Sequence, residues 1–328
     1  MRPMLKVNTM NLKCSKSVLL GTSALVCLAL SAPVMADDFV ITGSNGSTNG
    51  TGTRNGGFAR LMANDINGSD TVSLGIALTT TGTNVGIKTN NNDTEAQSNT
   101  VTVTKTGSIT TGTGNNAYGI FNDGAYNTTT VSGSITTGVV GTNAGEDSTG
   151  IWNYGNDNTT TLTSTGVITV NGPKADGIYN SSGDKNITIV HGSIFVNGNG
   201  VADDYAEGIT NYGDDNETTL SGSITTTGNY AMGIANYGNN NKVTISGTVK
   251  STGAKSGALY NYSGSGNSFT LNEGATIIGD ILAVDEIGTA YDATNSKLIF
   301  NLGASTSYAY SVSGKGEGTT AGQWDFDD

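Results

Sequence analysis

The sequence has little of what stabilises small secreted domains or carries out catalysis. Of its 328 residues, two are cysteine, three are proline and one is histidine. Both cysteines, Cys14 and Cys27, lie in an N-terminal stretch that we expect to be removed. The mature chain then has no thiol, which excludes a disulfide framework and thiolate metal ligands. Its stability must come from another source.

Positive charge is also scarce. The chain has 15 basic and 27 acidic residues, and its net charge is −12. Arg2, Lys6, Lys13 and Lys16 belong to the same N-terminal stretch, so their removal takes the net charge to −16. Nucleic acids and anionic membrane surfaces are bound by clustered lysine and arginine, and the chain has no such cluster. We therefore expect no nucleic-acid partner.

Residues 1–36 have the three parts of a secretory signal. Basic residues come first, an apolar run follows at 18–30, and small residues precede a cut between Ala36 and Asp37. The apolar run is too short for a transmembrane helix, so we expect a cleaved signal peptide, export, and no membrane span in the mature chain.

Two sequence patterns alternate along residues 104–278. The first is AYGIFNDGAYN at 117–127, and versions of it begin at residues 148, 175, 206, 231 and 256. The second is TVSGSITT at 130–137, and a version of it follows each copy of the first. The glycines of the first pattern lie 31, 27, 31 and 25 residues apart, at Gly119, Gly150, Gly177, Gly208 and Gly233. A nearly constant path with one variable loop is typical of stacked coils.

Both patterns favour strands over helices. Val131, Gly133 and Ile135 share one face of the second pattern, and Ile120 and Asn122 share one face of the first. Glycine recurs every few residues, and no period of 3.6 residues persists. The sequence therefore predicts an all-β chain in which each coil is built from short strands.

Two asparagines per coil keep a nearly constant spacing, as the pairs Asn122/Asn127, Asn153/Asn158, Asn180/Asn186, Asn211/Asn216, Asn236/Asn241 and Asn261/Asn267. Stacking would place equivalent residues about 4.8 Å apart, where side-chain amides bond along a ladder. The glycines between them predict a turn with positive φ, at Gly124, Gly155, Gly213 and Gly238. We interpret the asparagines as structural. The alternative is a sugar-binding surface that includes the neighbouring tyrosines Tyr154, Tyr212, Tyr237 and Tyr262.

These repeats resemble the passenger domains of bacterial autotransporters, the type V secretion proteins. The resemblance rests on the form A-x-G-I-x-N-x-G-x-x-N-x-x-T-V-S-G-S-I-T-T and covers residues 86–280. It implies a right-handed, single-stranded parallel β-helix, displayed on or released from the Gram-negative outer membrane and often adhesive.

The signal, the repeats and the resemblance together divide the chain into four segments. We expect a signal peptide at 1–36, an irregular N-terminal cap at 37–85, β-helix repeats at 86–274 and C-terminal capping strands at 275–328. The stretch 56–66 is expected to form a short helix or cap. After residue 324 the sequence has no series of amphipathic strands for the family's outer-membrane barrel, which we therefore expect to be missing from this chain. Without a barrel, a periplasmic location is the alternative to the cell surface.

Groups for catalysis are few, and we predict no catalytic, cofactor-binding or metal-binding residue. His191 aligns with serines of an outward column, and Ser148 lies in a variable linker. The aspartates of the turns allow two interpretations, calcium ligands or a solvated acidic surface: Asp157, Asp184, Asp203, Asp204, Asp214 and Asp215.

The leading hypothesis is a structural or adhesive surface protein without catalysis, whose partner is a host, matrix or glycan ligand. Two alternatives stay open. One is a polysaccharide-acting β-helix enzyme, which predicts an acid cluster along one groove. The other is a non-functional remnant of a larger autotransporter.

Overall fold

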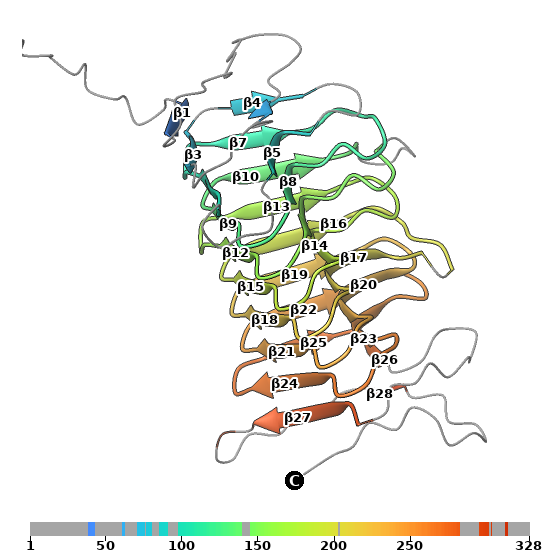
Figure 1. Ribbon diagram of the computed structural model, residues 1–328. Coiled ribbons are helices and arrows are strands. Elements are labelled where there is room, and N and C mark those ends of the chain that lie inside the picture. Colours follow the sequence, from blue (N-terminus) through green and yellow to red (C-terminus); the bar gives the residue numbers. More distant parts are fainter. Residues whose placement is uncertain are drawn as a thin grey trace, which may run out of the picture. The chain divides into compact units, whose positions relative to one another are not determined.

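The computed structural model describes the larger part of the mature chain, in the ranges 39–42, 61–62, 71–75, 77–80, 85–90, 98–139, 145–202, 204–282, 295–301, 303 and 312–313. All of these residues belong to one compact unit, Met35–Asp328. Within these ranges the chain forms strands and turns and no helix, and the parallel sheets stack as a β-solenoid of about seven turns. Figure 1 shows successive coils lying one below the other. The all-β solenoid predicted from the repeats is confirmed.

Three sheets run along the stack, and each coil adds one strand to each. Sheet A consists of β1 (Phe39–Thr42), β3 (Thr71–Leu74), β6 (Thr100–Val103), β9 (Thr128–Val131), β12 (Thr159–Leu162), β15 (Ile187–Val190), β18 (Glu217–Leu220), β21 (Lys242–Ile245), β24 (Ser268–Asn272) and β27 (Lys297–Asn301). Sheet C consists of β4 (Ala77–Thr79), β7 (Ser108–Thr110), β10 (Ser134–Thr137), β13 (Val167–Val170), β16 (Ser193–Val196), β19 (Ser223–Thr226), β22 (Thr248–Ser251) and β25 (Thr276–Ile278). Sheet B consists of β2 (Leu61–Met62), β5 (Ile87–Asn90), β8 (Ile120–Asp123), β11 (Ile151–Tyr154), β14 (Ile178–Ser181), β17 (Ala206–Asn211), β20 (Ala231–Asn236), β23 (Gly257–Asn261), β26 (Asp280–Leu282) and β28 (Val312–Ser313).

The repeats stack in strict register. Ile120, Ile151 and Ile178 are aligned through β8, β11 and β14, and their side chains are fully buried between the sheets. All described strand pairs are parallel apart from β1 with β3, which is antiparallel. Because one aliphatic side chain per strand recurs at the same place, the core is a set of continuous apolar columns along the stack.

The pattern TVSGSITT is two strands, where the sequence predicted one. β9 ends at Val131 in sheet A, and β10 begins at Ser134 in sheet C. The alternation continues through the corner, since Val131, Gly133 and Ile135 are all buried. A Cβ on Gly133 would lie 1.9 Å from the carbonyl oxygen of Gly107 in the preceding coil. The corner therefore requires glycine, because backbones of neighbouring coils approach too closely for any side chain.

The asparagine columns form the predicted ladders. In the first column Asn122 Nδ2 donates to Asn153 Oδ1 at 2.7 Å, and Asn153 repeats this bond to Asn180 at 2.7 Å. In the second column the backbone N–H of Asn127 donates to Asn158 Oδ1 at 2.8 Å. These asparagines are fully buried, so their bonds along the stack satisfy amides that have no water to bind.

The left-handed residue of the asparagine turn is not always the predicted glycine. Gly124 and Gly155 have φ of 108° and 138°, as expected. Gly213 and Gly238 do not adopt positive φ, and glycine is needed there because a Cβ would meet the turn of the previous coil. The residue just before the second asparagine is left-handed in every coil from 98 to 267 that carries the pair, at Tyr126, Asp157, Lys185, Asp215, Asn240 and Gly266.

The described ends of the chain extend the stack. In the stretch 56–66, expected to form a short helix or a cap, the described residues Leu61 and Met62 form β2, which pairs with β5, so the helix alternative is wrong at these two positions. At the other end β27 pairs with β24 and buries Leu298 against the core. The signal-like segment 1–36 with Cys14 and Cys27, residue Asp203 and residues 324–328 lie outside the described ranges.

Candidate functional site

The outer face of sheet B carries side chains that change from coil to coil. They form three columns, and several members of the first and third columns lie just before or just after a strand. The first column runs Tyr118, Thr149, Asp176, Glu207 and Met232; the second runs Phe121, Trp152, Tyr179, Thr210 and Ala235; the third runs Asp123, Tyr154, Ser181, Tyr212 and Tyr237. The inner face of the same strands keeps one isoleucine and one asparagine per coil.

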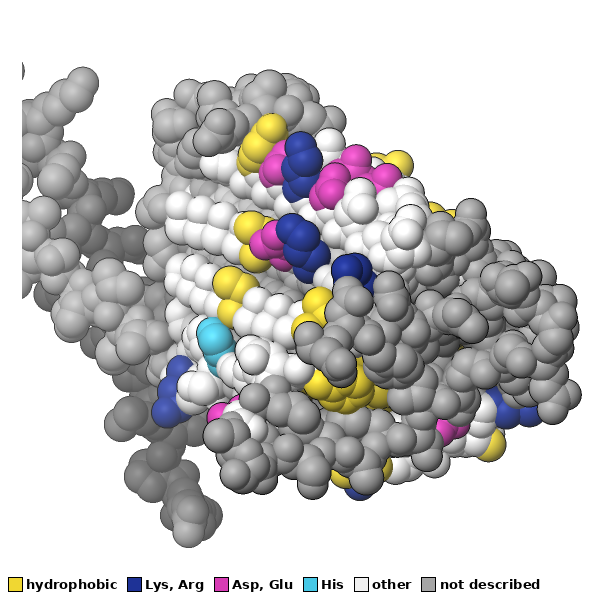
Figure 2. All heavy atoms as spheres, turned by 90° about the horizontal axis from the view of Figure 1, so that it is seen from below, with side chains coloured by type: hydrophobic (Ala, Val, Ile, Leu, Met, Phe, Trp, Pro, Cys, Tyr) yellow, Lys and Arg dark blue, Asp and Glu magenta, His cyan; other side chains and the backbone are white. Residues whose placement is uncertain are grey.

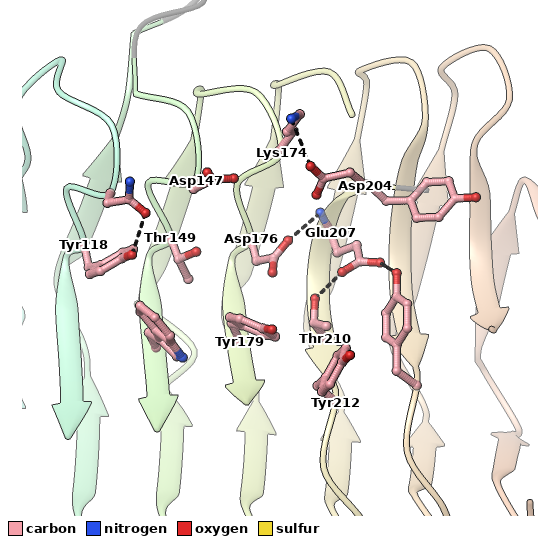
Figure 3. Close-up of a pocket in the computed structure, with 14 residues that line it drawn as sticks. Tyr118, Asp147, Thr149, Lys174, Asp176, Tyr179, Asp204, Glu207, Thr210 and Tyr212 are labelled. Carbon is pink, nitrogen blue, oxygen red and sulfur yellow. Dashed lines mark hydrogen bonds and ion pairs between the residues drawn. The ribbon is translucent and has the colours of Figure 1, made fainter. Parts of the chain in front are cut away.

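A cavity of about 290 Å³ opens on this face. Its volume is at the lower end of the range of small-molecule sites. Figure 3 shows the side chains that line it, drawn from coils that are neighbours in the stack and distant in sequence. They come from all three columns and from the loops that enter sheet B: Asn116, Tyr118, Asp147, Thr149, Trp152, Lys174, Asp176, Tyr179, Asp204, Tyr205, Glu207, Thr210, Tyr212 and Tyr237.

Two carboxyl side chains lie side by side at the buried floor of the cavity, Asp176 just before β14 and Glu207 in β17. Asp176 is 8% exposed and Glu207 is 4% exposed. Asp176 Oδ1 accepts the backbone N–H of Glu207 at 3.0 Å, while Glu207 accepts the hydroxyls of Thr210 and Tyr237, one on each oxygen. The Thr210 hydroxyl also interacts with Asp176. Since it carries a single proton, it cannot donate to both carboxyls at once.

The pair favours protonated carboxyls. Burial raises the pKa of Glu207 to about 7, against the lowering effect of its bonds from Thr210 and Tyr237 and with a further rise from Asp204. Burial, followed by the charge of Glu207, raises the pKa of Asp176 well above its usual value. Two carboxylates in a site with little water cannot both ionise easily, so the pair retains a proton near neutral pH.

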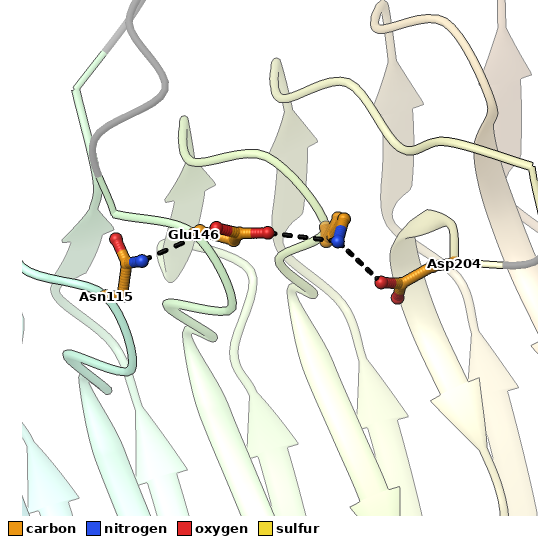
Figure 4. Close-up of polar contacts among 4 residues, drawn as sticks. Asn115, Glu146 and Asp204 are labelled. Carbon is orange, nitrogen blue, oxygen red and sulfur yellow. Dashed lines mark hydrogen bonds and ion pairs between the residues drawn. The ribbon is translucent and has the colours of Figure 1, made fainter.

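A charged network forms the rim above this pair. Lys174 Nζ lies 3.0 Å from Glu146 and 2.9 Å from Asp204, and so links three successive coils, as Figure 4 shows. Lys174 donates hydrogen bonds to these two carboxylates, Asp204 first, and these bonds raise the pKa of Lys174. Asp147 has no comparable partner among the described residues, and loss of water followed by the charges of Asp204 and Glu146 raises its pKa.

Aromatic side chains form one wall. Trp152 stacks on Tyr179 with ring centres 5.8 Å apart and 23° between the planes, and on Phe121 at 4.8 Å and 28°. Tyr118 meets the edge of Trp152 at 4.7 Å. Trp152 and Tyr179 are only partly buried, so ring surface remains available beside the carboxyl pair. Burial and then Asp176 raise the pKa of Tyr179, which keeps its phenol neutral.

The opposite wall is a small apolar cluster outside the main core. Tyr205, Met232, Ala235 and Tyr260 are buried there, and Tyr237 packs against them. Tyr212 stacks on Tyr237 at 5.5 Å and is 56% exposed. The cavity is thus a strip of carboxyls bounded by aromatic rings on both sides.

The loops that enter sheet B pass the rim in a strained conformation. Asn116, Asp147 and Lys174 occupy equivalent places in three coils and have φ of 58°, 56° and 52°. This conformation is unfavourable for a lysine by about 1–2 kcal/mol, although asparagine and aspartate tolerate it better. The arrangement holds the rim side chains at a fixed height above the strands.

The structure shows which of the residues considered in the sequence analysis lie at the cavity and which do not. Tyr212 and Tyr237 line the cavity, whereas Tyr154 lies beside a second hollow near Asp123 and Tyr126. The ladder asparagines are buried and cannot reach a ligand. His191 is exposed away from the cavity, bonded through Nδ1 to Ser221 at 2.6 Å in the outward column, as predicted. Figure 2 shows it, in cyan, on a face where charged side chains stand in small groups.

Ser148 is also placed by the structure. Its hydroxyl accepts the N–H of Ala117 and donates to the carbonyl of Gly114, so it serves the loop and lies buried. For the turn aspartates, the described residues contain no group of three or more His, Cys, Asp or Glu arranged to hold a metal ion.

The carboxyl pair was not singled out from the sequence, although a signal for it is present. In the pattern A-x-G-I, the variable position x is Tyr118, Thr149, Asp176, Glu207 and Met232 in successive coils. A position that changes within an otherwise regular repeat, and becomes acidic in two adjacent coils, indicates a local site. Only the stacking distance shows that these acids are neighbours.

No family model, no curated protein and no solved structure matches the chain. Within the described residues, no helix has the length and apolar character needed to cross a membrane.

Proposed function

We propose that this chain is an exported, surface-displayed or secreted structural protein that binds a glycan in the acidic, aromatic-lined cavity of sheet B. The signal-like N-terminus and the resemblance to autotransporter passengers support export and display. The solenoid supplies a rigid support, and the cavity supplies a place for a ligand. In this proposal the chain binds and does not catalyse.

The observation that carries the proposal is the juxtaposition of Trp152 and Tyr179 with Asp176 and Thr210. A sugar ring has an apolar face of C–H groups, which packs on the electron-rich face of an aromatic ring. Its hydroxyls need acceptors and donors at the edge of that contact, and the carboxyl and threonine oxygens lie there. An apolar platform beside a few polar groups is the usual composition of a small-ligand site.

A glycan array with the full chain tests the proposal, followed by titration calorimetry with the best oligosaccharide. Trp152→Ala is expected to weaken binding by about tenfold or more, because a stacked aromatic anchor is worth 1–2 kcal/mol or more. Phe195→Ala is the matched control, an exposed aromatic of strand β16 in sheet C that lies outside the cavity. No binding to any glycan, or equal loss in both variants, would refute the site.

The second candidate is a polysaccharide-acting enzyme, which the buried pair Asp176 and Glu207 favours. Glycoside hydrolysis uses two carboxyl groups, one protonated and one ionised, on either side of the scissile bond. The raised pKa of Glu207, about 7, suits a proton donor near neutral pH. Release of reducing ends from a bound polysaccharide, lost in Glu207→Gln, would establish this candidate over simple binding.

A further inference from the structure

The charges around the cavity do not balance. Asp147, Asp176, Asp204 and Glu207 line it, and Lys174 is the single basic residue among the lining side chains. Lys174 is already paired with Asp204 and with Glu146 outside the cavity. Three carboxyl groups, those of Asp147, Asp176 and Glu207, are therefore left without a cation of their own among the described residues.

The empty space adjoins these carboxyls and the aromatic wall together. Asp176 is more than nine-tenths buried, and its Oδ1 accepts the N–H of Glu207. Among the described residues, the one hydroxyl that interacts with this carboxyl, that of Thr210, is shared with Glu207. Tyr179 lies beside it and stacks on Trp152 through one face, while the next member of its column is Thr210 and not a ring. A cation is attracted both by a carboxylate and by the face of an aromatic ring, so the two features point to the same ligand charge.

On the basis of the proposed glycan function, we infer that the cavity selects an amine-bearing saccharide and binds its positively charged nitrogen between the Asp176–Glu207 pair and the Trp152–Tyr179 rings. Acidic polysaccharides are excluded from the same place, because they would bring further negative charge to carboxyls that already repel one another.

This selection makes binding depend on pH. Without ligand, Glu207 and Asp176 share a proton, and Asp147, Asp204, Glu146, Tyr179, Tyr237 and Lys174 are the charged or titratable groups around them. A bound cation stabilises the ionised carboxyls, so it displaces protons from the pair. Affinity for a permanent cation should therefore rise as the pH increases through about 7.

The test uses the full chain and three short oligosaccharides of the same β-linked glucosamine backbone, in N-trimethylated, N-acetylated and N-succinylated forms. The trimethylated form keeps its charge at every pH, so any pH dependence comes from the protein. It should bind about tenfold tighter than the neutral acetylated form at pH 7.5, as expected for one cation–π contact together with a carboxylate. The succinylated, anionic form should bind most weakly. Calorimetry in two buffers of different ionisation enthalpy should detect proton release with the cation alone.

Glu207→Gln should reduce the preference for the cationic sugar to about threefold or less and flatten the pH profile, because it removes one charge of the pair. Asp215→Asn, which removes the same charge from an exposed turn outside the cavity, should change neither, and the urea midpoints of both variants show that the chain is folded. Equal binding of trimethylated and acetylated sugars would overturn the inference and leave glycan binding intact. Binding of none of the three, with none on the glycan array, would overturn the proposed function itself.

Discussion

The two faces of sheet B are made by the same strands and follow opposite rules. Inside, each coil from β8 to β20 repeats an isoleucine and an asparagine in register. Outside, the first column changes from tyrosine through threonine to aspartate, glutamate and methionine in five successive coils. The inner face pairs its amides along the stack from Asn122 to Asn211, whereas the outer face keeps two buried carboxyls that compete for one hydroxyl proton.

The inner face of sheet B stabilises the fold, and the outer face determines the chemistry of the surface. A solenoid is stable when neighbouring coils match, so positions that face the next coil must repeat. Outward positions touch solvent and tolerate any residue, so their departures from the repeat cost the stack little. A buried acidic pair at such a position is unfavourable in itself, and a ligand is one way to offset that cost.

The largest effect should come from the inner face. Asn180 accepts from Asn153 at 2.7 Å, and its Nδ2 donates to Asn211 and Thr188 at 2.9 and 3.1 Å. Asn180→Ala leaves these three buried partners short of one bond each. Since each unpaired buried polar group costs about 1–3 kcal/mol, we expect a loss of about 4 kcal/mol in the free energy of unfolding, measured by urea denaturation.

Asn156→Ala is the matched control for the ladder. Asn156 lies on an exposed turn, where its side chain accepts one N–H bond, from Asp184 at 2.9 Å. Water replaces that bond in the variant, so we expect a loss below about 1 kcal/mol. Similar losses in the two variants would mean that the buried ladder contributes no more than a surface bond.

The buried carboxyl of Glu207 on the outer face should make the free energy of unfolding depend on pH. The pKa of Glu207 rises from 4.5 to about 7 on folding. The folded chain then binds more protons than the unfolded chain between these values, so stability is highest below pH 4.5 and falls as the pH increases towards 7. One pKa unit corresponds to about 1.4 kcal/mol, so this carboxyl should destabilise the fold by about 3 kcal/mol above pH 7.

Glu207→Gln removes this titration. The difference in unfolding free energy between the variant and the parent chain should grow by about 3 kcal/mol in favour of the variant from pH 4.5 to pH 8. Asp215→Asn, which removes a carboxyl from an exposed turn outside the cavity, is the control for the loss of one negative charge. A flat difference for Glu207→Gln would show that its carboxyl is ionised in the folded chain with no penalty.

The fold could be predicted from the sequence because the inner positions repeat, and each of them is constrained by an identical neighbour. Ile151, Asn153 and Gly150 carry the same information as Ile120, Asn122 and Gly119. The corner at Ser132–Gly133 was missed because the burial alternation continues through it, so periodicity alone cannot distinguish a bent strand from a straight one. The sequence predicted positive φ at Gly213, but in this turn the left-handed residue is Asp215. Glycine is needed at position 213 because the turns of neighbouring coils approach closely there.

The candidate site was less accessible to sequence reasoning. Asp176 and Glu207 are 31 residues apart, and Asp147 lies in a loop of variable length. Their proximity follows from the register of β14 and β17, which an aligned repeat provides only after the coil is known. Their burial depends on Tyr205 and Tyr237, which reach over from other loops and coils, and no pattern in the sequence records that packing.

The smallest expected effect concerns the buried amides of the inner face, whose hydrogen bonding is incomplete near the C-terminal end of the stack. From Asn122 to Asn211, each first-column amide also donates to a threonine of sheet A, at 3.0 to 3.3 Å. At the next coil Val243 replaces this threonine, and Asn236 Nδ2 has no hydrogen-bond partner among the residues that the structure describes. Val243→Thr restores the hydroxyl at nearly the same volume, so its new bond offsets the cost of burying it, and we expect a gain of about 0.5–1 kcal/mol in unfolding free energy.

Val190→Thr is the control. It buries the same hydroxyl at a fully buried position of β15, where the described residues leave no amide unpaired, and should lose about 1–3 kcal/mol. If both variants lose stability equally, the unpaired amide of Asn236 does not limit the last coils, and threonine in the earlier coils would have to be explained by strand packing instead.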